Sequence, residues 1–304
     1  MLLLLFLACS PGRDRDDGDD SGSVFGDSGS DDLNHDVLLV ADNTEDSADE
    51  MLAVALTIAD WLTEGMRVGI TTTSANIEDG PTDGLDAGEA GTLLIAPRSD
   101  PAEVAAAVIC QGIAWKESSI PHDREYTCGD AYTEASLEML DCVCGNDGWN
   151  TQPGSGTEEG LESALSAACR SYGDMPGDCV TDAGPLTAAD AGSHDFLRDG
   201  ANLRIVIVSS EGDSSRRLSN GQDDTTVYQD AFNAVSGDWQ VSVIGPVWDG
   251  SDGSCLNSST TWGVERYQDI ADASGGVYEG LTDVDDDCTP RDLGAAMQAI
   301  VTGF

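Results

Sequence analysis

Carboxylate and hydroxyl side chains are the groups in this sequence best placed to bind a ligand. They gather in three short segments, residues 42–46, 71–74 and 209–213, and each segment directly follows an apolar run typical of a buried strand. A fourth polar segment, the turn at residues 154–157, opens a predicted helix. Because ligands of parallel sheets bind at the carboxyl ends of the strands, we expect the four segments to form one site at that edge.

Other kinds of catalytic site find little support. Serine hydrolases of the common type need the turn G-x-S-x-G, which does not occur in the sequence. Lys116 is the single lysine, so a Schiff base or a phosphate-clamping lysine has one candidate, in a cysteine-rich segment. The three histidines, His35, His122 and His194, precede a strand or lie in polar loops, which favours surface positions. We predict that the protein is not an enzyme.

The elements that must position the polar segments alternate between strands and helices. The apolar pattern predicts strands at residues 36–41, 66–72, 203–209, 239–245 and 276–279, and helices at residues 47–63, 101–113, 157–170, 227–235, 264–273 and 290–301. Ser47 and Glu50 have the spacing of a capping box for the first helix, and Pro290 suits the first turn of the last one. The alternation predicts an α/β fold, with a doubly wound, mostly parallel central sheet and helices on both faces.

The N-terminal segment has the composition of an export signal followed by a linker. Residues 1–8 are almost entirely apolar and end in a small residue, as in a signal peptide, and they are too few to span a bilayer. Residues 9–32 are rich in Ser, Gly and Asp, which predicts a disordered acidic tether. Their acidic run at 16–20 has no EF-hand spacing, so it indicates a self-repelling linker rather than a calcium loop. The folded domain is expected at residues 33–304.

Cysteine usage agrees with export. Eight cysteines remain when Cys9 is set aside, and an even number in an exported chain predicts disulfides. Six of them fall between residues 110 and 179, so we expect a Cys-rich, disulfide-stapled insertion at residues 110–150. Zinc is the competing interpretation, but Cys142 and Cys144 lack the usual C-x₂-C spacing and no His pair accompanies them.

The charge of the chain excludes some partners. It has 13 basic and 57 acidic residues and a net charge of −44. Nucleic-acid binding needs clustered Lys and Arg, and docking on anionic lipid needs a basic patch. We therefore expect no nucleic-acid partner and no electrostatic contact with a membrane.

Three segments resemble those of a von Willebrand factor A domain. Residues 36–51 resemble that family's first strand and DxSxS metal-binding loop, residues 154–165 the loop with its metal-binding Thr, and residues 203–215 the strand and loop that usually supply a second Asp. The surroundings of Cys255, Arg266-Tyr267, Gly275-Gly276 and Cys288 resemble exported A-domain lipoproteins of Gram-negative bacteria. The resemblance covers residues 35–304.

The resemblance implies a site for Mg²⁺ or Ca²⁺, ions that prefer oxygen ligands. Carried over position by position, it makes Asp42, Thr44, Asp46, Thr157 and Ser210 the metal ligands. Asp46 stands where the family has a Ser, and Ser210 stands where it has an Asp, so the formal ligand charge is unchanged if both bind. In the family, a carboxylate of the partner fills the open coordination position. The implied function is adhesion or ligand binding through a protein or other ligand that presents a carboxylate.

Two alternatives stay open at this point. Asp42 also suits a carboxylate at a helix N-terminus, and Thr44 and Thr157 suit ordinary turn or capping bonds, which would leave a structural A domain with a degenerate metal site. The second alternative is a surface metal-assisted hydrolase of phosphate esters, since such enzymes also place an Asp after their first buried strand. No second acid pair accompanies Asp42.

Residues 7–9, Leu-Ala-Cys, resemble the lipobox of a bacterial lipoprotein. That resemblance makes Cys9 the lipidation site. It implies an exported lipoprotein at the outer membrane or cell surface of a Gram-negative bacterium, in contact with the membrane through a lipid anchor only.

Overall fold

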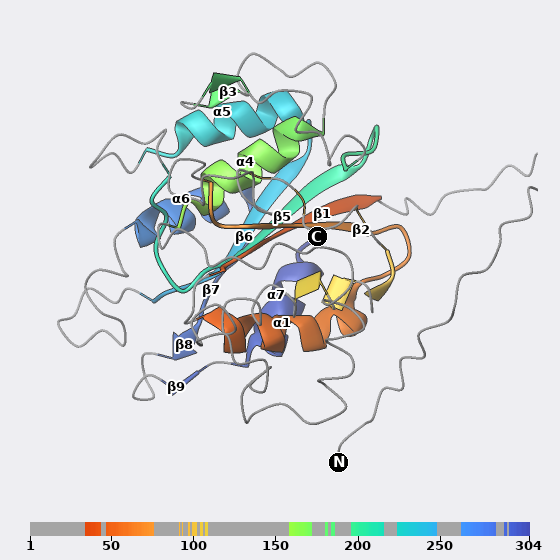
Figure 1. Cartoon of the computed structure of the whole chain (residues 1–304), viewed down its shortest axis with the longest axis vertical. Helices are drawn as coiled ribbons and strands as arrows, with labels where there is room; N and C mark the ends of the chain where they lie inside the picture. The colour runs from red at the N-terminus through yellow and green to blue at the C-terminus, as the bar shows by residue number, and fades with distance from the viewer. Residues whose placement is uncertain are drawn as a thin grey trace, which may run out of the picture.

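The computed structural model of the chain is shown in Figure 1. It describes residues 34–43, 47–75, 91, 93, 97, 99–101, 104, 105, 107, 108, 158–171, 180, 181, 184, 185, 196–215, 224–247, 263–283, 289, 290 and 292–304. The predicted signal peptide, the tether and the Cys-rich insertion lie outside these residues. Cys169 is the one cysteine among them, and it is disulfide-bonded.

Five parallel strands form the central sheet of the described part. In chain order they are β1 (His35–Ala41), β2 (Arg67–Thr72), β5 (Asn202–Val208), β6 (Trp239–Gly245) and β7 (Tyr278–Gly280). Their order in the sheet is β2-β1-β5-β6-β7, and every neighbouring pair is parallel. The order therefore reverses between β1 and β5, and in parallel sheets such a reversal opens a crevice at the carboxyl ends of the two strands. The predicted α/β class is confirmed.

Two further strand pairs are short and antiparallel. One joins β3 (Val180–Thr181) to β4 (Gly184–Pro185), and the other joins β8 (Thr282–Asp283) to β9 (Thr289–Pro290). Neither belongs to the central sheet.

Helices cover both faces of the sheet. α1 (Ala48–Trp61) and α7 (Leu293–Thr302) lie on one side, and α4 (Gly160–Arg170), α5 (Thr226–Val235) and α6 (Val264–Ser274) lie on the other (Figure 1). Residues 101, 104, 105, 107 and 108 are also helical, within the helix predicted at 101–113. No helix among the described residues is long and apolar enough to cross a membrane.

Each face of the sheet has its own hydrophobic core, because side chains along a strand alternate between faces. On β1, Val37 and Leu39 pack in the core that includes Ile58 of α1 and Met297 of α7. Leu38 and Val40 pack on the opposite face, in the core that contains the main apolar residues of α4, α5 and α6. Since both faces are covered, β1 is a continuous apolar run rather than an alternating one.

Ser47 is the N-cap of α1, as predicted, but two details of the predicted helix starts are wrong. The Ser47 side chain makes no capping bond to α1, because its hydroxyl donates to the carbonyl of Asp42 at 2.9 Å. Pro290 lies in β9, before the last helix. Asp292 caps α7 instead, and its carboxylate accepts the N–H groups of Gly294 and Ala295.

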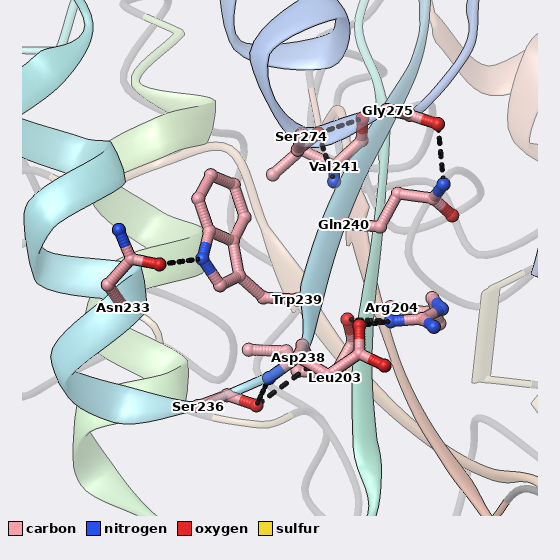
Figure 2. Close-up of polar contacts among 10 residues, drawn as sticks. All are labelled: Leu203, Arg204, Asn233, Ser236, Asp238, Trp239, Gln240, Val241, Ser274 and Gly275. Atoms are coloured by element: carbon pink, nitrogen blue, oxygen red, sulfur yellow. Dashed lines mark hydrogen bonds and ion pairs between the residues drawn. The ribbon is translucent and has the colours of Figure 1, made fainter.

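The amino ends of the strands carry paired charges. Fully buried Asp36 of β1 accepts a bond from the Arg198 side chain at 2.7 Å. Figure 2 shows a second pair, between Arg204 of β5 and Asp238 before β6, with Nη1 and Oδ1 3.0 Å apart. In the same view, Trp239 donates its ring N–H to Asn233 of α5 at 2.8 Å. The two ion pairs compensate the carboxylates at this edge, and the bond between Trp239 and Asn233 ties the start of β6 to α5.

Candidate functional site

Asp42 and Ser210 meet at the carboxyl edge of the sheet, where the strand order reverses. Asp42 follows the last residue of β1, and its N–H donates to the carbonyl of Val208 at the end of β5 (2.9 Å). The backbone N–H and the hydroxyl of Ser210 both donate to Oδ2 of Asp42, each at 2.7 Å. Asp42 is fully buried, and Ser210 is half-buried. Two predicted ligands that are 168 positions apart in the sequence are therefore in direct contact.

Hydroxyl groups fix the turn that follows β1. Ser47 donates to the carbonyl of Asp42 at 2.9 Å, and the Ser74 hydroxyl donates to Oδ1 of Asn43 at 3.0 Å. All four residues are buried. Ser74 lies just beyond the end of β2, so the segments after the two neighbouring strands are joined by their side chains. The polar segment at 71–74 thus supports the turn that carries Asp42.

The other predicted site residues lie outside the described residues. These are Thr44, Asp46 and Thr157, together with the predicted lipidation site Cys9. Glu158, which directly follows Thr157, is described.

Glu158 is a buried carboxylate at the same edge, and the sequence analysis did not select it. The N–H of its neighbour Glu159 donates to the carbonyl of Thr73 after β2 (2.9 Å), and the carbonyl of Glu158 accepts the N–H of Ser214 after β5 (2.6 Å). These two bonds hold the segment between two loops of the carboxyl edge, and Glu158 is fully buried there. Among the described residues, neither carboxylate oxygen of Glu158 has a hydrogen-bond partner.

The surroundings of Glu158 disfavour a negative charge. Burial raises the pKa of Glu158 well above its ordinary value, and the charge of Asp42 raises it further, followed by those of Glu211, Glu159 and Asp213. Among these charges, that of Asp42 has the largest effect on the pKa of Glu158. We therefore treat Asp42 and Glu158 as one acidic cluster. Buried carboxylates of this kind need a proton or a cation to compensate them.

Asp213 anchors the loop after β5 to the two helices beside the site. Its Oδ1 accepts the N–H of Leu161 in the first turn of α4 (3.1 Å) and the hydroxyl of Ser215 (2.7 Å). Nη1 of buried Arg266 on α6 donates to the Asp213 carbonyl (3.0 Å) and lies 3.9 Å from Oδ2. Burial raises the pKa of Asp213 to about 6, against the lowering effects of Ser215, Leu161 and Arg266. Asp213 therefore has a structural role and a cationic neighbour.

Tyr267 of α6 reaches the acidic cluster from the side of the helices. It is fully buried, and burial raises the pKa of its phenol well above the ordinary value. The charges of Asp213, Glu158 and Asp42 add to that effect. The Tyr267 hydroxyl lies only 2.3 Å from the position that a Cβ on Gly160 would occupy. The glycine at the start of α4 therefore lets this hydroxyl approach the cluster.

The donor set at this edge consists of oxygen atoms. Carboxylates come from Asp42 and Glu158, and hydroxyls come from Ser210 and from Thr73, whose buried Oγ1 has no hydrogen-bond partner in the described part of the chain. Such oxygen ligands suit Mg²⁺ and Ca²⁺. No group of three or more His, Cys, Asp and Glu side chains is arranged to hold a metal ion within the described ranges. The orphaned oxygens of Glu158 and Thr73 are the feature of this edge that fits a cation.

Sequence reasoning included Thr73 in the polar segment at 71–74 but missed Glu158, and it could not predict that both side chains are buried, because their burial is a tertiary effect. Both lie in polar segments, and neither has an apolar periodicity that would predict a buried position. A weak signal was present in the pair Glu158-Glu159, which precedes an apolar helix, where acidic residues are usually stabilised by the helix dipole.

Comparison with known proteins adds no assignment: no protein-family model matches the chain, and neither does any curated protein sequence.

Proposed function

We propose that the protein is an exported A-type domain that binds a divalent cation and, through it, an acidic group of a partner. The carboxyl edge between β1 and β5 is the proposed site. A lipid on Cys9 would hold the protein at the outer membrane or cell surface, with the acidic tether as a spacer. The partner is a protein or other ligand that presents a carboxylate.

The contact between Asp42 and Ser210 is the observation that carries this proposal. The resemblance assigns both positions to one metal site, and their side chains are 2.7 Å apart at the point where the strand order reverses. Helices on both faces of a parallel sheet also support an A-type fold.

In the proposal, Asp42 and Ser210 hold the cation together with Thr44, Asp46 and Thr157. The cation supplies the positive charge to which an acidic ligand binds. This contribution matters because the chain carries a net charge of −44, which repels an anionic partner. Binding of such a partner should therefore depend on the divalent cation.

Calorimetric titration of Mg²⁺ and of Ca²⁺ into the full chain tests the proposal. We expect one saturable site that Asp42→Ala weakens by about tenfold or more, because a buried ligand is lost. Moderate salt is needed, since 57 acidic residues also bind cations weakly. Asp238→Ala is the matched control, because Asp238 is an aspartate at the opposite edge of the sheet, paired with Arg204 (Figure 2).

Unchanged far-UV dichroism in both variants would show that the fold is retained. Diffuse binding shared by the wild type and both variants would contradict the proposal and leave a structural A domain. The alternative of a phosphoester hydrolase would need a positive group to hold the phosphate, and within the described residues the basic group at this edge, Arg266, is fully buried and donates to the carbonyl of Asp213.

A further inference from the structure

We infer that Glu158 is a ligand of the cation and supplies the carboxylate that the resemblance leads one to expect at position 210. This inference deepens the proposed function and rests on it. It assigns a role to a residue that lies outside the predicted ligand set.

The first argument is the position of Glu158. It is fully buried, and its segment is held by backbone bonds to Thr73 and Ser214, which follow β2 and β5. Those two strands flank β1, whose end carries Asp42. The backbone around Glu158 is therefore fixed between the two loops that border Asp42.

The second argument is that the Glu158 carboxylate has no hydrogen-bond partner among the described residues. Asp42 receives two hydrogen bonds from Ser210, and Asp213 receives bonds from Leu161 and Ser215. Both oxygens of Glu158 are buried and unpaired among the residues that the structure describes. A carboxylate is seldom buried without a partner, because the loss of its hydration is then not offset by other bonds. A bound cation would satisfy both oxygens.

The third argument is the exchange of residue types within the site. Ser210 takes the position of an Asp, and its hydroxyl and N–H bond to Asp42 instead of adding a negative charge. Glu158 brings a carboxylate to the same edge from the segment that follows Thr157. Glu158 thus offers a carboxylate beside the loop in which Ser210 supplies only a hydroxyl, in addition to the carboxylate that Asp46 would contribute.

The test compares cation affinities by calorimetric titration of Mg²⁺ and of Ca²⁺ into the full chain. Glu158→Gln keeps the shape of the side chain and removes its charge. Glu162→Gln is the matched control, because Glu162 is also buried, one turn along α4, where it accepts the Tyr228 hydroxyl at 2.8 Å. The double variant Glu158→Gln/Ser210→Asp returns the carboxylate to position 210.

We expect Glu158→Gln to lower the affinity by about tenfold or more and Glu162→Gln to change it by less than about twofold. The double variant should recover most of the loss. That recovery would not occur if Glu158→Gln had merely disturbed the fold, and far-UV dichroism with thermal unfolding checks the fold directly.

Wild-type affinity in Glu158→Gln, with a loss in Asp42→Ala, would overturn this inference and leave the proposed function standing; Glu158 would then be a buried neutral acid. A loss of cation affinity in Glu158→Gln without recovery in the double variant would overturn the inference that the carboxylate of Glu158 takes the role of one at position 210. A wild-type chain without a saturable site would overturn both proposals.

Discussion

At the scale of single residues, Asp213 and Glu158 show two ways of burying a carboxylate. Asp213 is surrounded by donors from Leu161 and Ser215 and by the guanidinium of Arg266. Glu158 has no such set among the described residues, and its strongest charged neighbour, Asp42, is acidic. The first arrangement is complete within the protein, whereas the second needs a proton or a ligand.

The titration of Asp213 gives a prediction for stability against pH. Its pKa is about 6 in the folded protein and near the ordinary 3.8 in the unfolded chain, so the folded state binds more protons between these values. The stability that this group contributes is fully present below about pH 4 and is lost as the pH rises through about 6. Asp213→Asn should remove this dependence, which amounts to roughly 3 kcal/mol at most.

Urea unfolding of the wild type and of Asp213→Asn at pH 4, 5, 6 and 7 measures this pH dependence of stability. The free energy of unfolding of the wild type should fall relative to Asp213→Asn across this range. A difference that stays constant with pH would show that Asp213 titrates below the range.

At the scale of elements, the start of α4 is packed against α6 without room for a side chain. A Cβ on Gly160 would lie 2.3 Å from the Tyr267 hydroxyl and 3.0 Å from Cγ2 of Ile207. Because Tyr267 and Ile207 are fully buried, Gly160→Ala should push α4 outward and lower the free energy of unfolding by about 1–3 kcal/mol.

Denaturant unfolding tests this against Gly237→Ala, a change at a site with nothing within 4 Å of the new Cβ. That control should stay within about 0.5 kcal/mol of the wild type. Tyr267→Phe combined with Gly160→Ala should recover part of the loss, because the nearest clashing atom is removed. Equal effects of the two glycine changes would refute the packing argument.

Strands with a clear apolar pattern could be predicted from the sequence closely. The bounds of β6 match the prediction, β1 starts one residue earlier than predicted, and β5 is shifted by one residue at both ends. Details that depend on tertiary partners could not be predicted. The Ser47 hydroxyl bonds to the turn after β1 rather than to α1, and the burial of Glu158 depends on Thr73 and Ser214, which are distant in sequence.

At the scale of the whole molecule, the two edges of the sheet differ in how their charges are compensated. At the amino edge, Asp36 pairs with Arg198 and Asp238 pairs with Arg204. At the carboxyl edge, Arg266 forms an ion pair with Asp213, whereas Glu158 has no basic partner among the residues that the structure describes. Both carboxylates named at the amino edge are thus ion-paired, whereas the carboxyl edge leaves Glu158 uncompensated among the described residues, at the place where the proposed cation would bind.

The net charge of −44 gives a prediction for the stability of the whole chain in salt. Repulsion among the carboxylates weakens as the screening length falls from about 10 Å at 0.1 M to about 3 Å at 1 M salt. Each kcal/mol of relief raises Tm by about 2–4 °C in a domain of this size. We therefore expect Tm to rise by at least about 2 °C between 0.1 and 1 M NaCl.

Thermal unfolding followed by dichroism measures this, with KCl beside NaCl as a check that the effect is general screening. A lower Tm at high salt would show instead that ion pairs such as Arg204–Asp238 outweigh the repulsion.

The pairing of α7 with α1 on one face of the sheet has a consequence for biogenesis. Met297 and Ile300 of α7 complete the core that contains Met51 and Ile58 of α1. The ribosome makes α1 early, but the helix that closes its core emerges only after residue 302 has been added. This core therefore cannot close before α7 has been made, and we expect the unfinished face to present apolar side chains to chaperones and proteases until then.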